Sequence, residues 1–156
     1  MRIGFINICH TDYLNNAVTQ MAETAVQNLR DNDIDIYEAS IPASDYNNAY
    51  LAGLEMASAN LDGVILFLGS WTEGSTAMAA IREVEHLPML LWGFPMFPEG
   101  QVMQSTGSYV SFAMMRGSME RAGYRFIGLL GLPDDSSIIR TAVSFCRGAG
   151  AKTSLK

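Results

Sequence analysis

Charge is scarce in this chain, and so are cysteine and long apolar runs. Charged residues make up 17% of the 156 residues and hydrophobic residues 49%, a composition that excludes a disordered segment. The net charge is −6 and the basic residues are scattered, so we expect no nucleic acid as a partner. No apolar run approaches the roughly 20 residues of a membrane span, so we expect no membrane either. Cys9 and Cys146 form no CxxC pair, which is typical of free thiols in a cytoplasmic protein.

What the chain does have is a regular alternation of strand and helix patterns. Strands are predicted at 2–8, 34–38, 64–68, 89–92 and 125–130. Helices are predicted at 17–29, 45–60, 74–85, 107–122 and from 133 to about 147. Five such units predict one α/β domain over residues 1–147, a flavodoxin-like three-layer sandwich whose five-stranded parallel sheet has the order 2-1-3-4-5. Residues 148–156 are predicted to be a linker towards a following domain.

The stretch 62–76 is the centre of this pattern. Val64 to Leu68 are five consecutive large apolar residues, which indicates a strand buried on both faces. The polar turn 70–74 follows directly, and open α/β sheets bind their ligands at this carboxyl edge. Trp71 is unusual there, because a large indole is rare in a polar turn.

The carboxyl edge of the sheet lacks the residues that the best-known functions of this fold require. A phospho-receiver needs a lysine after the fifth strand, where the chain has Gly131 and Leu132. A flavin mononucleotide (FMN) site needs a glycine- and hydroxyl-rich loop after the first strand, and residues 10–15 contain no glycine. The turn 70–76 could still hold an anion at the start of its helix. His10 and His86 fall at opposite ends of the sheet, so they cannot form a two-histidine metal site. We expect this domain to bind no cofactor and no metal.

Several single residues have a structural and a functional interpretation. Cys9 is predicted to be a small buried residue, Asp12 to cap the helix that follows it, and Ser44 to cap the second helix. Trp71 either packs on the loop 94–97 or forms an aromatic platform for a ligand such as a sugar, or an anchor at an interface. The loop 94–97 is so apolar that we expect it to lie on a covered, oligomeric surface.

Three segments together resemble one family. They are His10-Thr-Asp-Tyr13, Asp62-Gly-Val-Ile-Leu-Phe-Leu-Gly-Ser-Trp-Thr-Glu-Gly74 and Pro88-Met-Leu-Leu-Trp-Gly-Phe-Pro95. This combination resembles the N-terminal domain of the L-fucose isomerase and L-arabinose isomerase family. The segments Ser105-Thr-Gly-Ser108, Arg125-Phe-Ile-Gly128 and Gly131-Leu-Pro-Asp-Asp135 fit the same pattern, so the likeness covers nearly the whole chain.

The resemblance implies a function shared with other parts of a longer protein. Such enzymes are three-domain chains that interconvert aldoses and ketoses with a manganese ion, and their metal ligands and catalytic carboxylates lie in the later domains. Their first domain lends residues to a neighbouring subunit's active site, among them a tryptophan at the position of Trp71. They also use a basic residue after the first strand, where this chain has His10 and no arginine.

The sequence therefore predicts the substrate-capping and oligomerisation domain of a manganese-dependent sugar isomerase, inactive alone and without catalytic residues of its own. We expect a homo-oligomer in which a sugar is shared with a neighbouring subunit. The residues predicted to face the sugar are His10, Tyr13, Trp71, Thr72, Gln104, Ser105 and Thr106. The alternative is a free-standing flavodoxin-like module that binds a small ligand or a partner without catalysis.

Overall fold

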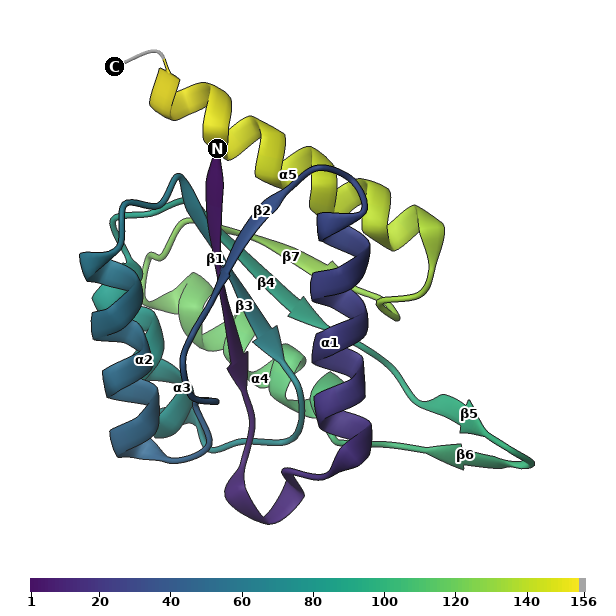
Figure 1. Cartoon of the computed structure of the whole chain (residues 1–156). Helices are drawn as coiled ribbons and strands as arrows, with labels where there is room; N and C mark the ends of the chain where they lie inside the picture. Colours follow the sequence, from purple (N-terminus) through teal and green to yellow (C-terminus); the bar gives the residue numbers. More distant parts are fainter. Residues whose placement is uncertain (155–156) are drawn as a thin grey trace.

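A five-stranded parallel sheet runs through the middle of the molecule (Figure 1). The computed structural model describes residues 1–154. The strand order is β2-β1-β3-β4-β7, which confirms the predicted flavodoxin-like order with β7 as the fifth strand. The strands are β1 (Arg2–Ile8), β2 (Asp35–Glu38), β3 (Gly63–Leu68), β4 (Met89–Gly93) and β7 (Phe126–Leu130).

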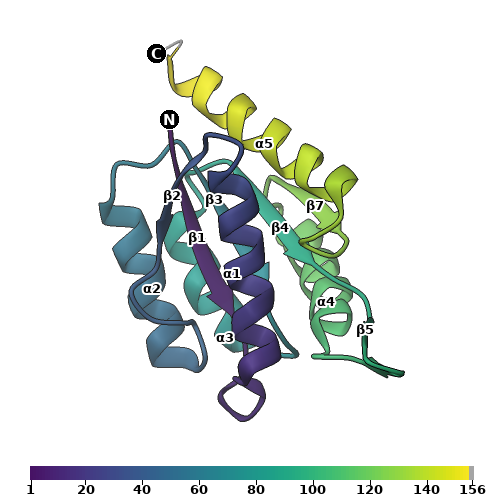
Figure 2. The ribbon, with the colours of Figure 1, turned by 45° about the vertical axis from the view of Figure 1, so that its right-hand side comes forward.

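Helices cover both faces of this sheet, which makes three layers (Figure 2). One face packs against α1 (Asn16–Arg30) and α5 (Ser136–Ser154), and the other against α2 (Tyr46–Ser58), α3 (Gly74–Ile81) and α4 (Ser108–Arg121). Every residue of β3 is buried, as expected of a central strand in a parallel sheet. The sheet edge that carries the carboxyl ends of the strands is therefore a rigid mount for the loops that follow them.

Two of the predicted helix caps differ from the observed ones. A short 3-10 turn, η1 (Thr11–Tyr13), separates β1 from α1, so Asn15 caps α1 by accepting a hydrogen bond from the Val18 amide, and Asp12 is an exposed residue of the turn. Asp45, one residue after the predicted cap Ser44, caps α2 by accepting a hydrogen bond from the Asn48 amide. Both corrections are shifts along a polar loop, where several side chains can serve as caps.

The C-terminal segment also differs. The predicted linker over 148–156 is helical through Ser154, because α5 continues past Arg147, while residues 155 and 156 lie outside the described residues. Gly148 and Gly150 weaken a helix in isolation, but Ala149 is buried against the sheet and tertiary packing keeps the segment helical. Within residues 1–154, no helix combines the length and the apolar composition needed to cross a membrane.

The loop 94–105 contains a hairpin that the sequence pattern did not indicate. Strands β5 (Phe97–Glu99) and β6 (Val102–Gln104) pair antiparallel, and the hairpin projects away from the central sheet (Figure 1). We name residues 96–104 the arm. Phe94 and Phe97 are 1% and 7% exposed, which corrects the prediction of an apolar surface formed by the whole 94–97 loop. Their rings pack against each other, and Phe94 stacks on Phe67 of β3.

A short 3-10 turn, η2 (Arg82–Val84), completes the predicted third helix before the chain enters β4. Gly123 has a φ of 80° after the end of α4, as expected for the residue that stops this helix.

Candidate functional site

Three aromatic rings meet where β1 and β3 end. His10 and Tyr13 follow β1, and Trp71 follows β3. The ring centroids lie 5.4 Å apart for His10 and Trp71, 6.0 Å for Tyr13 and Trp71, and 5.8 Å for His10 and Tyr13. β2 is added to the sheet on one side of β1, and β3 and the later strands on the other side, so the ends of β1 and β3 form the topological switch point. The cluster lies at this point, which is the usual ligand position of open α/β sheets.

Hydrogen bonds to its backbone hold Trp71 in place. The Trp71 amide donates to the Thr106 carbonyl at 2.7 Å, and the Ser70 hydroxyl donates to the Trp71 carbonyl at 2.8 Å. Ser70 also accepts a hydrogen bond from the His10 amide at 3.0 Å, which ties the β1 and β3 loops together. Gly107 lies against the Trp71 backbone with a φ of 79°, where a side chain would collide with the indole-bearing carbon. The ring contacts of Trp71 are with His10 and Tyr13.

His10 is oriented by its own turn. Its Nδ1 accepts a hydrogen bond from the Asp12 amide at 3.1 Å. In the neutral imidazole the proton is then on Nε2, so that atom is the one able to donate to a ligand. The His10 side chain is 25% exposed and Tyr13 is 45% exposed, so both rings can be reached from solvent.

Thr72, also predicted to face a substrate, is fully buried. Its amide donates to the Ser111 hydroxyl at 2.9 Å, and its own hydroxyl oxygen has no hydrogen-bond partner within the described chain. Thr72 has no surface for a ligand to touch in this arrangement. The hydrogen bond from the Thr72 amide to Ser111 of α4 anchors the Trp71 loop to this helix.

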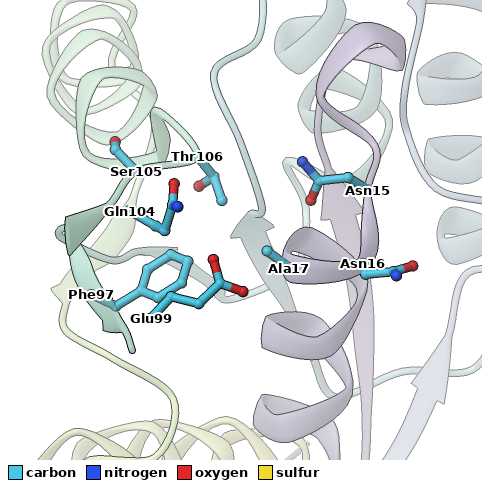
Figure 3. A pocket seen from close by; sticks show the side chains of 8 residues that line it. All are labelled: Asn15, Asn16, Ala17, Phe97, Glu99, Gln104, Ser105 and Thr106. Atoms are coloured by element: carbon cyan, nitrogen blue, oxygen red, sulfur yellow. The ribbon is translucent and has the colours of Figure 1, made fainter. Parts of the chain in front are cut away.

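A polar cleft of about 440 Å³ lies beside this loop (Figure 3). One wall is the start of α1 with Asn15, and the opposite wall carries Gln104, Ser105 and Thr106, which leads into α4. In Figure 3 the Glu99 carboxylate points from the arm into the cleft, towards Ala17 at the first turn of α1. Gln104 and Ser105 are exposed, whereas Thr106 is 7% exposed. The hydrogen bond from Trp71 to Thr106 connects the aromatic cluster to this cleft.

The structure thus brings the predicted residues into two adjoining groups, with Thr72 beneath them. Three polar residues of the cleft were not predicted from the sequence: Asn15, Asn16 and Glu99. Asn15 and Asn16 belong to the start of α1, which was predicted one residue too late. Glu99 belongs to a hairpin whose strands are too short to show alternation. The sequence does contain a sign that Glu99 is special, because it is the single charged residue between Glu85 and Arg116.

Every charged residue on the loops at this edge is acidic. The loops after β1, β2, β3, β4 and β7 contain Asp12, Asp45, Glu73, Glu99, Asp134 and Asp135 but no lysine or arginine. Such an edge disfavours anionic ligands and suits neutral, hydroxylated ones. At the start of α3, the Glu73 carboxylate adds a negative charge where an anion would approach, which weakens the alternative of an anion site there.

FMN, the cofactor that this fold binds at the same switch point in flavodoxins, does not fit these residues. A phosphate loop needs free backbone amides, but the amides of residues 11–14 donate to the Ser44 carbonyl, His10 Nδ1, the His10 carbonyl and the Thr11 carbonyl. Glu99 also points at the start of α1, where a phosphate would gain from the helix dipole.

Groups for metal binding or nucleophilic chemistry do not converge at this edge. Within residues 1–154, no three His, Cys, Asp or Glu side chains gather to hold a metal ion. Cys9 is fully buried as predicted, and burial raises the pKa of its thiol to about 12, so it stays protonated at neutral pH.

Comparison with known proteins adds little beyond the fold. No family model and no curated protein matches the sequence. Among solved structures, the flavodoxin-like domain of a Synechococcus protein matches with 10% identity and a TM-score of 0.44, over 99% of both chains. A Streptococcus pneumoniae TIGR4 flavodoxin matches with 14% identity and a TM-score of 0.48, over 97% of this chain and 99% of that one. These values carry no argument about function. The strand order β2-β1-β3-β4-β7, with helices on both faces, is what makes this chain a flavodoxin-like α/β domain.

Proposed function

We propose that this chain is the substrate-capping domain of a metal-dependent aldose–ketose isomerase and that it binds a sugar at the carboxyl edge of β1 and β3. The observation that carries the proposal is the contact between His10, Tyr13 and Trp71 beside a polar cleft. The resemblance of the segments around His10, Trp71 and Trp92 to L-fucose and L-arabinose isomerases supports it.

The aromatic cluster supplies what one face of a sugar needs. A pyranose or an open-chain sugar presents C–H groups on one side, and an aromatic ring offers an apolar surface with a negative π-face to such groups. Trp71 supplies the largest ring, and Tyr13 and His10 add a hydroxyl and an Nε2–H donor at its edge. The ligand can then be held by stacking and hydrogen bonds without any ion pair.

The adjoining cleft supplies the partners for sugar hydroxyls. Asn15 and Gln104 can both donate and accept, and Glu99 accepts. The exposed Ser105 hydroxyl accepts from the Gly107 amide and can still donate to a ligand. In this proposal the chain positions the sugar and excludes water. The manganese ion and the acid–base carboxylates belong to later domains, completed through a neighbouring subunit of a homo-oligomer in the cytoplasm.

The test is sugar binding by this chain. We expect L-fucose or L-arabinose to shift the NMR signals of His10, Tyr13 and the Trp71 indole. Trp71→Ala removes the main stacking surface, worth about 1.4 kcal/mol, and should weaken binding about tenfold. Tyr109→Ala is the matched control, because Tyr109 is an aromatic residue of α4 that is 54% exposed outside the cluster, and it should leave binding unchanged.

Two results would contradict the proposal. One is a set of shifted signals that omits the cluster, or equal binding by Trp71→Ala. The other is turnover of either sugar by this chain alone with Mn²⁺, which would make it an enzyme using its own edge and not a capping domain.

The second candidate is a flavodoxin-like module that binds a small ligand or a partner without any reaction. The observation that favours it is that both faces of the sheet are covered by the chain's own helices, so the domain has its own complete core. Failure of all sugars to bind, with a neutral ligand of another class shifting the same signals, would select this function.

A further inference from the structure

A second cleft, of about 210 Å³, is formed by β1, α1, the end of β2 and the loop that follows β2. Asn7 of β1 is part of its lining, and we name it the Asn7 cleft. It shares no lining residue with the polar cleft beside Trp71. The Asn7 cleft is therefore a separate candidate for ligand binding.

Asn7 is an unusual residue for a strand as buried as β1. From Ile3 to Ile8 every residue of the strand is buried except Asn7, which is half-buried. Asn7 Oδ1 and the Val18 side chain of α1 both occupy the space beside Gly69, so the carboxamide lies on the α1 side of the sheet. A side chain at position 69 would collide with Asn7 Oδ1. The glycine therefore leaves room for a polar group at this point of the core.

The Asn7 carboxamide makes no hydrogen bond within residues 1–154. Its Oδ1 is buried without a partner, and its Nδ2 donates to no described atom. Because Oδ1 is enclosed beside Gly69 and Val18, the Nδ2 side of the carboxamide is the one that lines the cleft. A buried polar group without a partner costs stability, and such groups need an explanation in a native fold. A ligand that accepts a hydrogen bond from Nδ2 supplies one.

The walls of the cleft suit an apolar ligand body. They are formed by the apolar side chains of Phe5, Leu14, Ala22, Ile41 and Pro42. The cleft has the volume of about seven water molecules in the liquid, which is enough for one six-membered ring with a substituent. The ligand that fits is therefore small.

The charges around the cleft decide which polar group the ligand carries. Glu23 and Glu38 both line it, and Glu38 is already paired with Arg30 at 2.9 Å. No lysine or arginine occurs among the described residues of the lining, so an anionic group is disfavoured. An ammonium group has only donors and cannot accept from Asn7 Nδ2. A neutral oxygen acceptor satisfies both conditions.

We infer that the Asn7 cleft binds a small neutral molecule with an apolar body and a hydroxyl or carbonyl oxygen, which accepts a hydrogen bond from Asn7 Nδ2. The bound ligand gives the carboxamide the partner that the free chain does not provide, so binding also stabilises the fold. This inference does not rest on sugar binding at Trp71.

The test uses three probes that share one ring and differ in their polar group: cyclohexanol, cyclohexylamine and cyclohexanecarboxylate. Each is titrated into the protein and followed by NMR. We expect cyclohexanol to shift the side-chain amide signals of Asn7 and the methyl signals of Leu14 and Ala22. Its affinity should be at least about threefold higher than that of the amine or the carboxylate, because only the alcohol combines a neutral charge with an acceptor.

Asn7→Leu separates ligand binding from folding. Leucine has nearly the shape of asparagine but no donor, so this variant should bind cyclohexanol about threefold to tenfold more weakly. Its midpoint of urea unfolding should stay the same or rise, because an unpaired polar group is removed. Asn28→Leu is the matched control, since the Asn28 side chain donates to the Pro133 carbonyl at 2.8 Å outside the cleft. This variant should lower the midpoint and leave cyclohexanol binding unchanged.

A purely structural role for Asn7 gives the opposite results. A lower unfolding midpoint for Asn7→Leu, or an unchanged affinity for cyclohexanol, would each overturn the inference. Tighter binding of cyclohexylamine that is lost in Glu23→Gln would also overturn it, because the polar group would then lie at Glu23. Cyclohexanol shifts confined to Tyr13 and Trp71 would place the probe at the aromatic cluster and leave the Asn7 cleft without a ligand.

Discussion

Gly107 shows how a single residue shapes the candidate site. It lies in the left-handed region with a φ of 79°, and a built side-chain carbon would be 2.6 Å from the Trp71 Cβ. The close approach allows the Thr106 carbonyl to accept from the Trp71 amide, and the adjacent Ser108 hydroxyl accepts from the Phe94 amide at 2.9 Å. The loop before α4 therefore fixes both the Trp71 loop and the start of the arm.

Gly107→Ala is expected to destabilise the fold by about 2–3 kcal/mol, since it combines a strained backbone with a steric collision. Gly117→Ala within α4 is the control, because its Cβ would meet no atom within 4 Å and the glycine carries only an entropic cost. That variant should gain about 0.5–1 kcal/mol. Urea unfolding of both variants checks the prediction, and equal stabilities would contradict it.

The two cysteines should be unreactive in the native protein. Both are fully buried, and burial raises the pKa of Cys9 and of Cys146 to about 12. Thiolate is the reactive form, so at pH 8 a disulfide reagent should label neither thiol until the chain opens. Rapid stoichiometric labelling without denaturant would contradict the burial of both side chains.

At the scale of elements, a carboxylate joins the edge strand to its helix. Glu55 of α2 accepts hydrogen bonds from the Ser40 amide at 3.0 Å, the Ser40 hydroxyl at 2.8 Å and the Tyr37 hydroxyl at 3.1 Å. Partial burial acts to raise the pKa of Glu55, but these hydrogen bonds outweigh it and lower the pKa. The same contact raises the pKa of Tyr37.

The lowered pKa of Glu55 gives this contact a pH dependence. Its stabilisation is present above the unfolded pKa of about 4.3 and is lost as the pH falls through the lower folded value. Glu55→Gln should therefore reduce stability at pH 7 by about 1 kcal/mol and flatten the acid limb of the stability curve. Glu120→Gln, which removes only an exposed pair with Arg116, should change neither. Chemical unfolding at pH 7 and near pH 4 distinguishes them.

At the scale of the whole molecule, the flavodoxin-like fold does not by itself imply binding of FMN, the usual cofactor of flavodoxins. The strand order is flavodoxin-like, yet the amides of residues 11–14 already donate hydrogen bonds and the loops at the ligand edge are acidic. Fold alone does not determine function, because the ligand is selected by the loops and not by the sheet.

We therefore expect the chain to leave FMN unbound in a flavin fluorescence titration. Glu99→Gln should not create binding by itself, since the turn amides stay occupied. Quenching of flavin fluorescence with one molecule bound per chain would contradict the fit of these residues and would also weigh against the sugar site at the same edge.

The sequence by itself determined the sheet, the strand order and which loops share its carboxyl edge. These follow from local signals: the continuous apolar run of Val64 to Leu68, the alternation around Ile36 and the regular spacing of buried residues in the helices. It also placed His10, Tyr13 and Trp71 on neighbouring loops, because parallel strands that pair bring their ends together.

Only the tertiary structure decided what each loop residue does. Thr72 and Trp71 are adjacent in sequence, but the Ser111 contact buries one while the rings of His10 and Tyr13 hold the other at the surface. The arm depends on the pairing of residues 97–99 with 102–104 and on the burial of Phe97. Strands of three residues are too short to show a hydrophobic period in the sequence, so neither feature could be predicted. Such features depend on contacts between distant segments, so they exist only once the core has positioned both partners.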